Sequence, residues 1–153
     1  SFSKSLSLPG ERLGYVLVPK QVTDADSVYA ATAGAGRSQG YVNAPSLFQR
    51  VAAECCDLTA DISVYERNCA LLTDALREMG YHVVQPGGAF YLFPRSLEPD
   101  DMAFSERAKK FDLLLVPGSG FGAPGHFRIA YCVQTEMIER ALPRFKALAD
   151  SYQ

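Results

Sequence analysis

Apolar positions between residues 62 and 79 give the clearest periodic pattern in the chain. They recur at spacings of three and four residues, at Ile62, Tyr65, Cys69, Leu72, Leu76 and Met79. This spacing places them on one face of an α-helix. Gly80 follows, and a left-handed glycine commonly ends a helix. The pattern therefore predicts an amphipathic helix over residues 62–79.

Capping residues and helix breakers predict two helices before that one. Thr23 or Asp24 can cap a helix over residues 25–32. The glycine-rich residues 34–40 then predict a loop. A second helix begins near Ser46, after a proline.

Two more helices are predicted towards the end of the chain. Asp100 or Asp101 can cap a short helix that runs to Lys110. Thr135 can cap the last helix, whose apolar stripe includes Ile138, Leu142 and Phe145. A proline inside that stripe, Pro143, predicts a kink, because proline removes one backbone hydrogen bond and crowds the preceding turn.

Short apolar or alternating segments predict strands between these helices. Residues 13–18 indicate a short buried strand, and residues 81–84 and 89–93 indicate two β segments around a turn. The continuous apolar run at 113–116 is typical of a strand buried on both faces. Residues 126–132 alternate, as in a strand with one buried face. Helices thus alternate with strands, which predicts the α/β to α+β class.

Composition narrows the possible function. The chain has 153 residues, of which 48% are hydrophobic and 21% charged, as expected for a soluble globular protein with one ordinary core. A net charge of -2 and the lack of a basic run give no attraction to nucleic acid or anionic membranes. No apolar run reaches the roughly 20 residues of a membrane span, so we expect a cytoplasmic protein.

The cysteines and the first residue add two expectations. The four cysteines include the adjacent pair Cys55 and Cys56 and lack C-x-x-C spacing, so we expect reduced thiols and no metal site. The chain starts at Ser1 without an initiator methionine. We therefore expect either a processed protein or a piece of a longer one, and we favour the second interpretation.

The first residues contain the candidate chemistry. Lys4 is flanked by serine hydroxyl groups, and Arg12 follows eight residues later. A nucleophilic amine beside anion-binding groups suits a phosphorylated carbonyl ligand. On the residues alone, a solvated lysine and arginine in a serine-rich segment remain the alternative.

Three segments resemble one enzyme family. Residues 1–15 follow the pattern S-x-S-K-x-x-x-x-P-G-x-R-x-G-Y, which is similar to the cofactor-lysine signature of class I and II aminotransferases. Residues 85–91 resemble the P-x-G-[GA]-x-[FY] segment of the same family. Residues 115–131 resemble its P-G-x-x-F-G loop and R-[ILV]-[SA] strand. The resemblance is to the aspartate aminotransferase type of the pyridoxal-phosphate-dependent transferases, fold type I.

The resemblance assigns roles at the lysine segment. It implies that Lys4 binds pyridoxal 5'-phosphate covalently and then moves a proton at the substrate α-carbon. Ser1 and Arg12 would bind the cofactor phosphate, with Ser3 as a further candidate. A guanidinium fork matches phosphate oxygens, and a lysine of lowered pKa condenses with carbonyls, so both residue types suit these tasks.

Two other arginines would bind the substrate. Arg128 corresponds to the family's arginine for the α-carboxylate, which a planar guanidinium holds at two points. The alternative for Arg128 is a structural ion pair. Arg37 lies near the position where some members reach a distal carboxylate across a dimer interface, and its alternative is a solvated loop arginine.

The resemblance also implies an organisation and an activity. Residues 1–60 would end the large cofactor domain, and residues 61–153 would form the small domain of a homodimeric enzyme that uses amino acids and 2-oxo acids. The family's aspartate for the pyridine nitrogen lies upstream of the lysine, so we expect this chain alone to be inactive. A carbon–sulfur β-lyase on the same scaffold, or a non-catalytic effector domain of a transcription regulator, are the alternatives.

Overall fold

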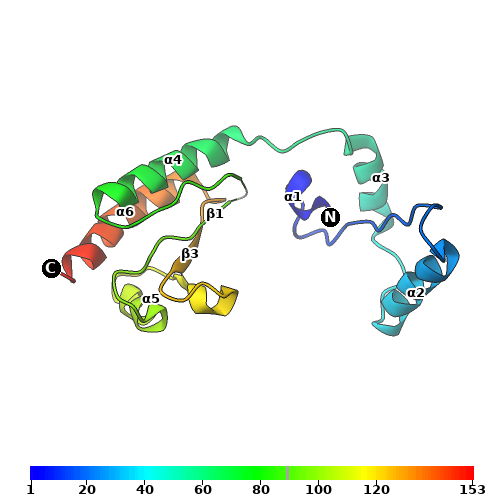
Figure 1. Ribbon diagram of the computed structural model, residues 1–153. Coiled ribbons are helices and arrows are strands. Elements are labelled where there is room, and N and C mark those ends of the chain that lie inside the picture. Colours follow the sequence, from blue (N-terminus) through cyan, green and yellow to red (C-terminus); the bar gives the residue numbers. More distant parts are fainter. Residues whose placement is uncertain (89) are drawn as a thin grey trace. The chain divides into compact units, whose positions relative to one another are not determined.

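A computed structural model describes residues 1–88 and 90–153 and divides the chain into two compact units. The N-terminal unit is Ser1–Asp61 and the C-terminal unit is Ile62–Gln153. The N-terminal unit contains the helices α1 (Phe2–Ser5), α2 (Ala25–Ser38) and α3 (Ser46–Cys55) (Figure 1). The C-terminal unit contains α4 (Ser63–Glu78), β1 (Tyr91–Leu92), α5 (Asp101–Lys109), β2 (Val116–Pro117), the 3-10 helix η1 (Gly118–Phe121), β3 (Phe127–Ala130) and α6 (Thr135–Asp150).

The N-terminal unit has little core of its own. Its buried apolar residues are Leu13 and Ala52. The strand predicted over residues 13–18 is wrong: this segment has no strand partner within the described N-terminal unit. Tyr15 and Leu17 are 72% and 76% exposed. A strand is stabilised by a hydrogen-bonded neighbour, so an apolar β-prone sequence stays unpaired where no neighbour is available.

Helix α2 is longer than the sequence predicts. It runs to Ser38 and includes Gly34 and Gly36, so the predicted glycine-rich loop is wrong over most of its length. Glycine costs only about 1 kcal/mol relative to alanine inside a helix, and alanines alternate with these glycines. The helix ends before Gly40, whose φ of 88° is left-handed. Helix α3 begins at Ser46, as predicted.

Helices α4 and α6 form the main packing pair of the C-terminal unit (Figure 1). The predicted apolar stripe of α4 is confirmed from Tyr65 onwards, since Cys69, Leu72 and Leu76 are buried, but its first member Ile62 precedes the helix and is exposed. Gly80 follows with a φ of 90°. From α6, the core receives Ile138, Phe145, Leu148 and Ala149. Helix α6 continues through Pro143, and the kink there stays a prediction.

A small antiparallel sheet with the order β1-β3-β2 completes this unit. Tyr91 pairs with Ala130, and Val116 pairs with Arg128. The predicted strand at 113–116 is reduced to β2 and is not buried on both faces, because Leu114 is 85% exposed. Residues 81–84 form no strand, and Ala89, the first residue of the predicted 89–93 strand, lies outside the described residues.

Capping agrees with prediction at α5 and differs at α6, whereas at α2 the predicted Asp24 is the N-cap but makes no side-chain hydrogen bond. The Asp100 carboxylate accepts hydrogen bonds from the backbone N–H groups of Met102 and Ala103, at 3.0 Å each, and begins α5. At α6 the N-cap is Gln134 without a side-chain hydrogen bond, so the predicted cap at Thr135 is wrong. Within the described residues, no helix combines the length and apolarity needed to cross a membrane.

Candidate functional site

The lysine segment is a single helical turn begun by serine. The Ser1 Oγ accepts a hydrogen bond from the Ser3 backbone N–H at 3.3 Å and donates one to the Ser3 Oγ at 3.1 Å. Lys4 lies in this turn and its side chain is exposed. The structure therefore brings the two predicted serines together in the same helical turn as the predicted lysine.

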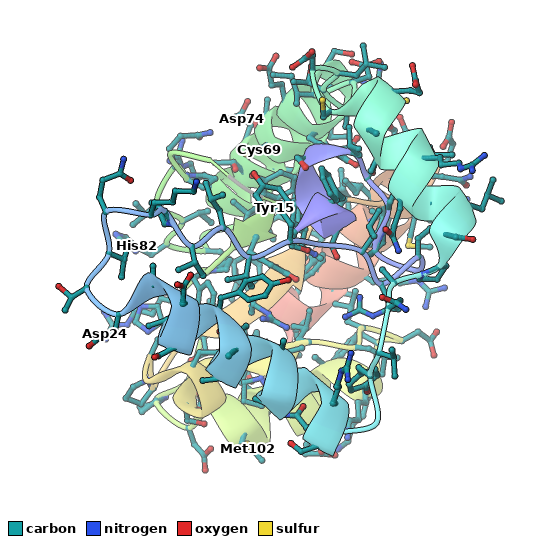
Figure 2. The ribbon with its side chains drawn as sticks, turned by 90° about the vertical axis from the view of Figure 1, so that its right-hand side faces the viewer. Tyr15, Asp24, Cys69, Asp74, His82 and Met102 are labelled. Atoms are coloured by element: carbon teal, nitrogen blue, oxygen red, sulfur yellow. The ribbon has the colours of Figure 1, made fainter. Side chains whose placement is uncertain are left out.

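Residues 12–14 return to the start of the chain. The Phe2 backbone N–H donates to the Leu13 carbonyl at 3.0 Å, and the Phe2 and Tyr15 rings lie 5.8 Å apart (Tyr15 is labelled in Figure 2). A Cβ atom on Gly14 would lie 3.2 Å from the Ser1 Cα, so a side chain there would crowd the serine turn. Glycine thus permits this close approach.

Arg12 is held in an unusual conformation beside this contact. Its φ of 52° is left-handed, which a non-glycine residue adopts rarely, and its Nη1 donates to the Pro9 carbonyl at 2.7 Å. This hydrogen bond uses one of the five guanidinium donors, and the side chain is exposed. Two hydroxyls, an amine and a guanidinium lie in this small part of the unit, a donor set that fits a phosphorylated aldehyde.

Arg37 lies in the last turn of α2 and is exposed. The alternative of a solvated loop arginine is therefore wrong about the loop, since Arg37 is helical, but agrees with its exposure. The predicted contact with a distal carboxylate stays a prediction.

Arg128 belongs to the C-terminal unit, where two aromatic rings hold its side chain. Its Cζ lies 4.1 Å from the ring centroid of Phe121, which ends η1. It also lies 4.4 Å from the ring centroid of Tyr91 on β1. Guanidinium groups are attracted to aromatic ring faces at such distances.

Among the described residues, no acidic side chain forms an ion pair with Arg128. The four ion pairs of the described residues join other charges, at Arg107, Lys109, Arg144 and Lys146. The alternative of a structural ion pair for Arg128 is therefore wrong within residues 1–88 and 90–153. A guanidinium that lies over aromatic rings and forms no ion pair among the described residues can bind an external carboxylate.

The loop before β3 places Phe121 beside this strand. The Gly118 backbone N–H donates to the His126 carbonyl at 2.8 Å, and the Ala123 N–H donates to the Gly118 carbonyl at 3.0 Å. A Cβ atom on Gly118 would lie 2.2 Å from the Ala123 carbonyl oxygen, so only glycine fits. The Ser119 N–H also donates to the buried carboxylate of Asp101, at 2.6 Å.

A buried asparagine ties the other end of β3 to α4. Asn68 is fully buried, and its Nδ2 donates to the carbonyls of Tyr131 at 3.1 Å and Val133 at 2.7 Å. Its Oδ1 accepts a hydrogen bond from the Thr135 hydroxyl at 2.8 Å. The strand that carries Arg128 is thus fixed at both ends.

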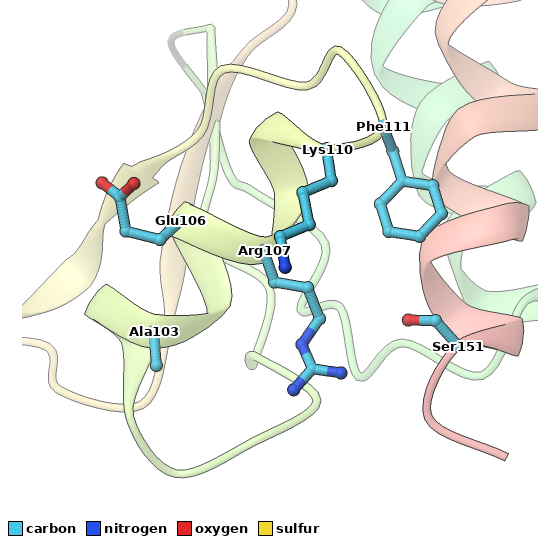
Figure 3. A pocket seen from close by; sticks show the side chains of 6 residues that line it. All are labelled: Ala103, Glu106, Arg107, Lys110, Phe111 and Ser151. Carbon is cyan, nitrogen blue, oxygen red and sulfur yellow. The ribbon is translucent and has the colours of Figure 1, made fainter.

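Two surface hollows of the C-terminal unit, each about 610 Å³, lie among other residues. One is lined by side chains of α5, with Arg107 and Lys110 on one side and Phe111 and Ser151 facing them (Figure 3). Arg107 stacks on the Tyr152 ring at 4.5 Å and pairs with Glu98 at 3.7 Å, so this cation already has partners. Neither hollow includes a predicted site residue.

Comparison with known proteins gives the family. The model of the family "Aminotransferase class I and II" matches residues 1–145. The chain belongs to this family.

Individual relatives agree with this membership. An aspartate aminotransferase of Thermotoga maritima is 30% identical over 98% of this chain and 38% of its own length. A probable aspartate/prephenate aminotransferase of Aquifex aeolicus is 31% identical over 95% of this chain and 39% of its own length. A solved aminotransferase structure from Eubacterium rectale is 52% identical, covers 100% of this chain and 38% of that one, and superposes with a TM-score of 0.91. The fold is thus that of a part of a fold type I aminotransferase, and the chain spans under two fifths of these relatives' length.

The sequence alone did not identify the two rings at Arg128. Phe121 is the aromatic residue of the P-G-x-x-F-G segment, and Tyr91 ends the P-x-G-[GA]-x-[FY] segment. The aromatic position in each of these two motifs was the sequence feature that could have indicated the rings.

Proposed function

We propose that this chain is the C-terminal portion of a pyridoxal-phosphate-dependent aminotransferase that moves an amino group from an amino acid to a 2-oxo acid. The observation that carries the proposal is the family match over residues 1–145, which includes both the lysine signature and Arg128. Bound pyridoxal phosphate supplies an electron sink for charge that develops at the substrate α-carbon.

The residues of the chain would divide the work as follows. Lys4 would hold the cofactor through its amine, and the same amine would hold and move a proton at the substrate α-carbon. Ser1, Ser3 and Arg12 bind the phosphate, which anchors the ring relative to the lysine. Arg128 binds the α-carboxylate and so orients the bond that is broken.

The proposal extends to organisation. Residues 1–60 would belong to the large cofactor domain and residues 61–153 to the small domain. The protein would be a cytoplasmic homodimer in which Arg37 approaches the substrate bound by the partner subunit. The exposed side chains of Tyr41 and Val42, 72% and 69% exposed, support an interface near this segment.

The β-lyase and the regulator domain would retain the same lysine and arginines. The relatives' names favour amino-group transfer over both. Release of pyruvate without a 2-oxo acid acceptor would instead favour the lyase.

The test compares the full-length protein with Lys4→Ala and with Lys20→Ala, another exposed lysine of the same unit. Each is mixed with pyridoxal phosphate, its visible absorbance is recorded, and borohydride reduction followed by peptide mass spectrometry locates the attached cofactor. We expect Lys20→Ala to behave as wild type and Lys4→Ala to lose both the protein-bound absorbance and the modified peptide. If Lys4→Ala kept the wild-type spectrum and the reduced cofactor were found on a peptide that contains another lysine, Lys4 would be excluded.

A further inference from the structure

The guanidinium of Arg128 is placed by two rings that come from different elements. Phe121 ends η1 and Tyr91 lies on β1, and their centroids lie 4.1 Å and 4.4 Å from the Arg128 Cζ. Among the described residues Arg128 takes part in none of the ion pairs, so these ring contacts leave its charge without a carboxylate partner there. A planar carboxylate binds in that plane, at two points.

The rings are themselves held by the fold. Tyr91 is paired with Ala130 in the sheet, two residues from the arginine. The Phe121 ring packs edge-on against Phe93, with centroids 5.9 Å apart and an interplanar angle of 82°. Tyr91 is therefore held through its backbone and Phe121 through its ring, although their side chains are 36% and 50% exposed.

We propose that Phe121 and Tyr91 are positioning residues that orient Arg128 for a substrate carboxylate before the substrate arrives. The inference rests on the proposed function, since it assigns the carboxylate to the amino acid or 2-oxo acid. An arginine side chain has several rotatable bonds, and ordering it on binding costs free energy. Ordering it beforehand lowers that cost.

The expected effect follows from the strength of such contacts. A ring–guanidinium contact that is partly exposed contributes a factor of about 3 to 30 in an equilibrium constant. Phe121→Leu and Tyr91→Leu keep an apolar side chain but remove the ring. Each should raise the KM for the amino acid about 3- to 30-fold and change kcat much less, because the proton-moving lysine is untouched.

Matched variants separate the ring from general packing. Phe121→Tyr and Tyr91→Phe keep an aromatic face and should keep the wild-type KM. In an Arg128→Lys background, Phe121→Leu should change KM by less than about twofold, because the ring acts through the guanidinium. A full effect of Phe121→Leu in that background would overturn the proposal.

A second readout does not depend on activity. The ¹⁵N order parameter of the Arg128 Nε–H group, assigned by its loss in Arg128→Lys, should fall in the two leucine variants and stay high in the ring-preserving ones. An unchanged order parameter, or an unchanged KM in an active enzyme, would overturn the positioning role. A wild-type protein without transaminase activity, but with the expected loss of order in the variants, would overturn the proposed function and leave the positioning role standing.

Discussion

Replacing Asn68 by alanine should destabilise the C-terminal unit strongly. Asn68 is fully buried and makes hydrogen bonds of 2.7 to 3.1 Å with Tyr131, Val133 and Thr135. Asn68→Ala removes all of them and leaves the two backbone carbonyls without this donor in a buried environment. The α4 helix itself should tolerate the change, because alanine favours helix.

The lost hydrogen bonds set the size of the decrease in the free energy of unfolding. An unsatisfied buried polar group costs about 1–3 kcal/mol, and the partly buried Thr135 side of the network can recover a partner from water. Two affected carbonyls, of which one can relax towards solvent, give a loss of about 2–4 kcal/mol in the free energy of unfolding. This corresponds to a decrease of about 30- to 1000-fold in the ratio of folded to unfolded protein.

Urea denaturation followed by near-ultraviolet circular dichroism measures this loss. Asp74→Ala is the matched control, since Asp74 is an exposed residue of the same helix (labelled in Figure 2). The control should stay within about 0.5 kcal/mol of wild type. If Asn68→Ala were as stable as Asp74→Ala, the hydrogen bonds of Asn68 would not hold the strand end.

Two further predictions follow from the packing of the C-terminal unit. Gly118→Ala should lower the free energy of unfolding by about 1–3 kcal/mol, because its Cβ would lie 2.2 Å from the Ala123 carbonyl oxygen. Gly120 has open space around it, so Gly120→Ala should be near neutral in the same urea denaturation assay. Burial raises the pKa of Tyr81 above its ordinary value of 10.0, so the tyrosine ionises first in the unfolded chain. The stability should therefore be intact below about pH 10 and fall as the pH rises beyond it, by at most about 1.4 kcal/mol per pH unit for this group. Tyr81→Phe should lose the hydrogen bond to the Phe145 carbonyl at neutral pH but show a shallower alkaline decline, and an equally steep decline in this variant would contradict the assignment.

The fold was predictable where local signals and tertiary packing agree. The α4 stripe has both a regular period and a terminating glycine, and Asp100 caps α5 as its position predicts. Residues 13–18 have an equally apolar sequence, but a strand depends on a partner that sequence period alone does not supply. The end of α2 was misplaced because Gly34 and Gly36 lower helix stability without ending the helix, and Gly40 adopts the left-handed conformation beyond it.

The candidate site was predictable as a set of residues but only partly as an arrangement. The serines at positions 1 and 3 are neighbours in sequence, so their contact follows from a single helical turn. The surroundings of Arg128 depend on Tyr91, 37 positions earlier, and on a loop that only Gly118 permits. Such long-range contacts follow from strand register, which this sequence specifies weakly in its two-residue strands.

The uneven distribution of buried side chains implies different lifetimes for the backbone hydrogen bonds of the two units. In the C-terminal unit the amide protons of α4 and α6 lie over a continuous core, so exchange with deuterated water requires opening of that core. In the N-terminal unit residues 15–17 have no strand partner and high exposure, so their amides should exchange nearly as fast as in an unstructured peptide. If another segment or protein packs on Tyr15, Val16 and Leu17, deuterium uptake at these three positions should therefore become slower.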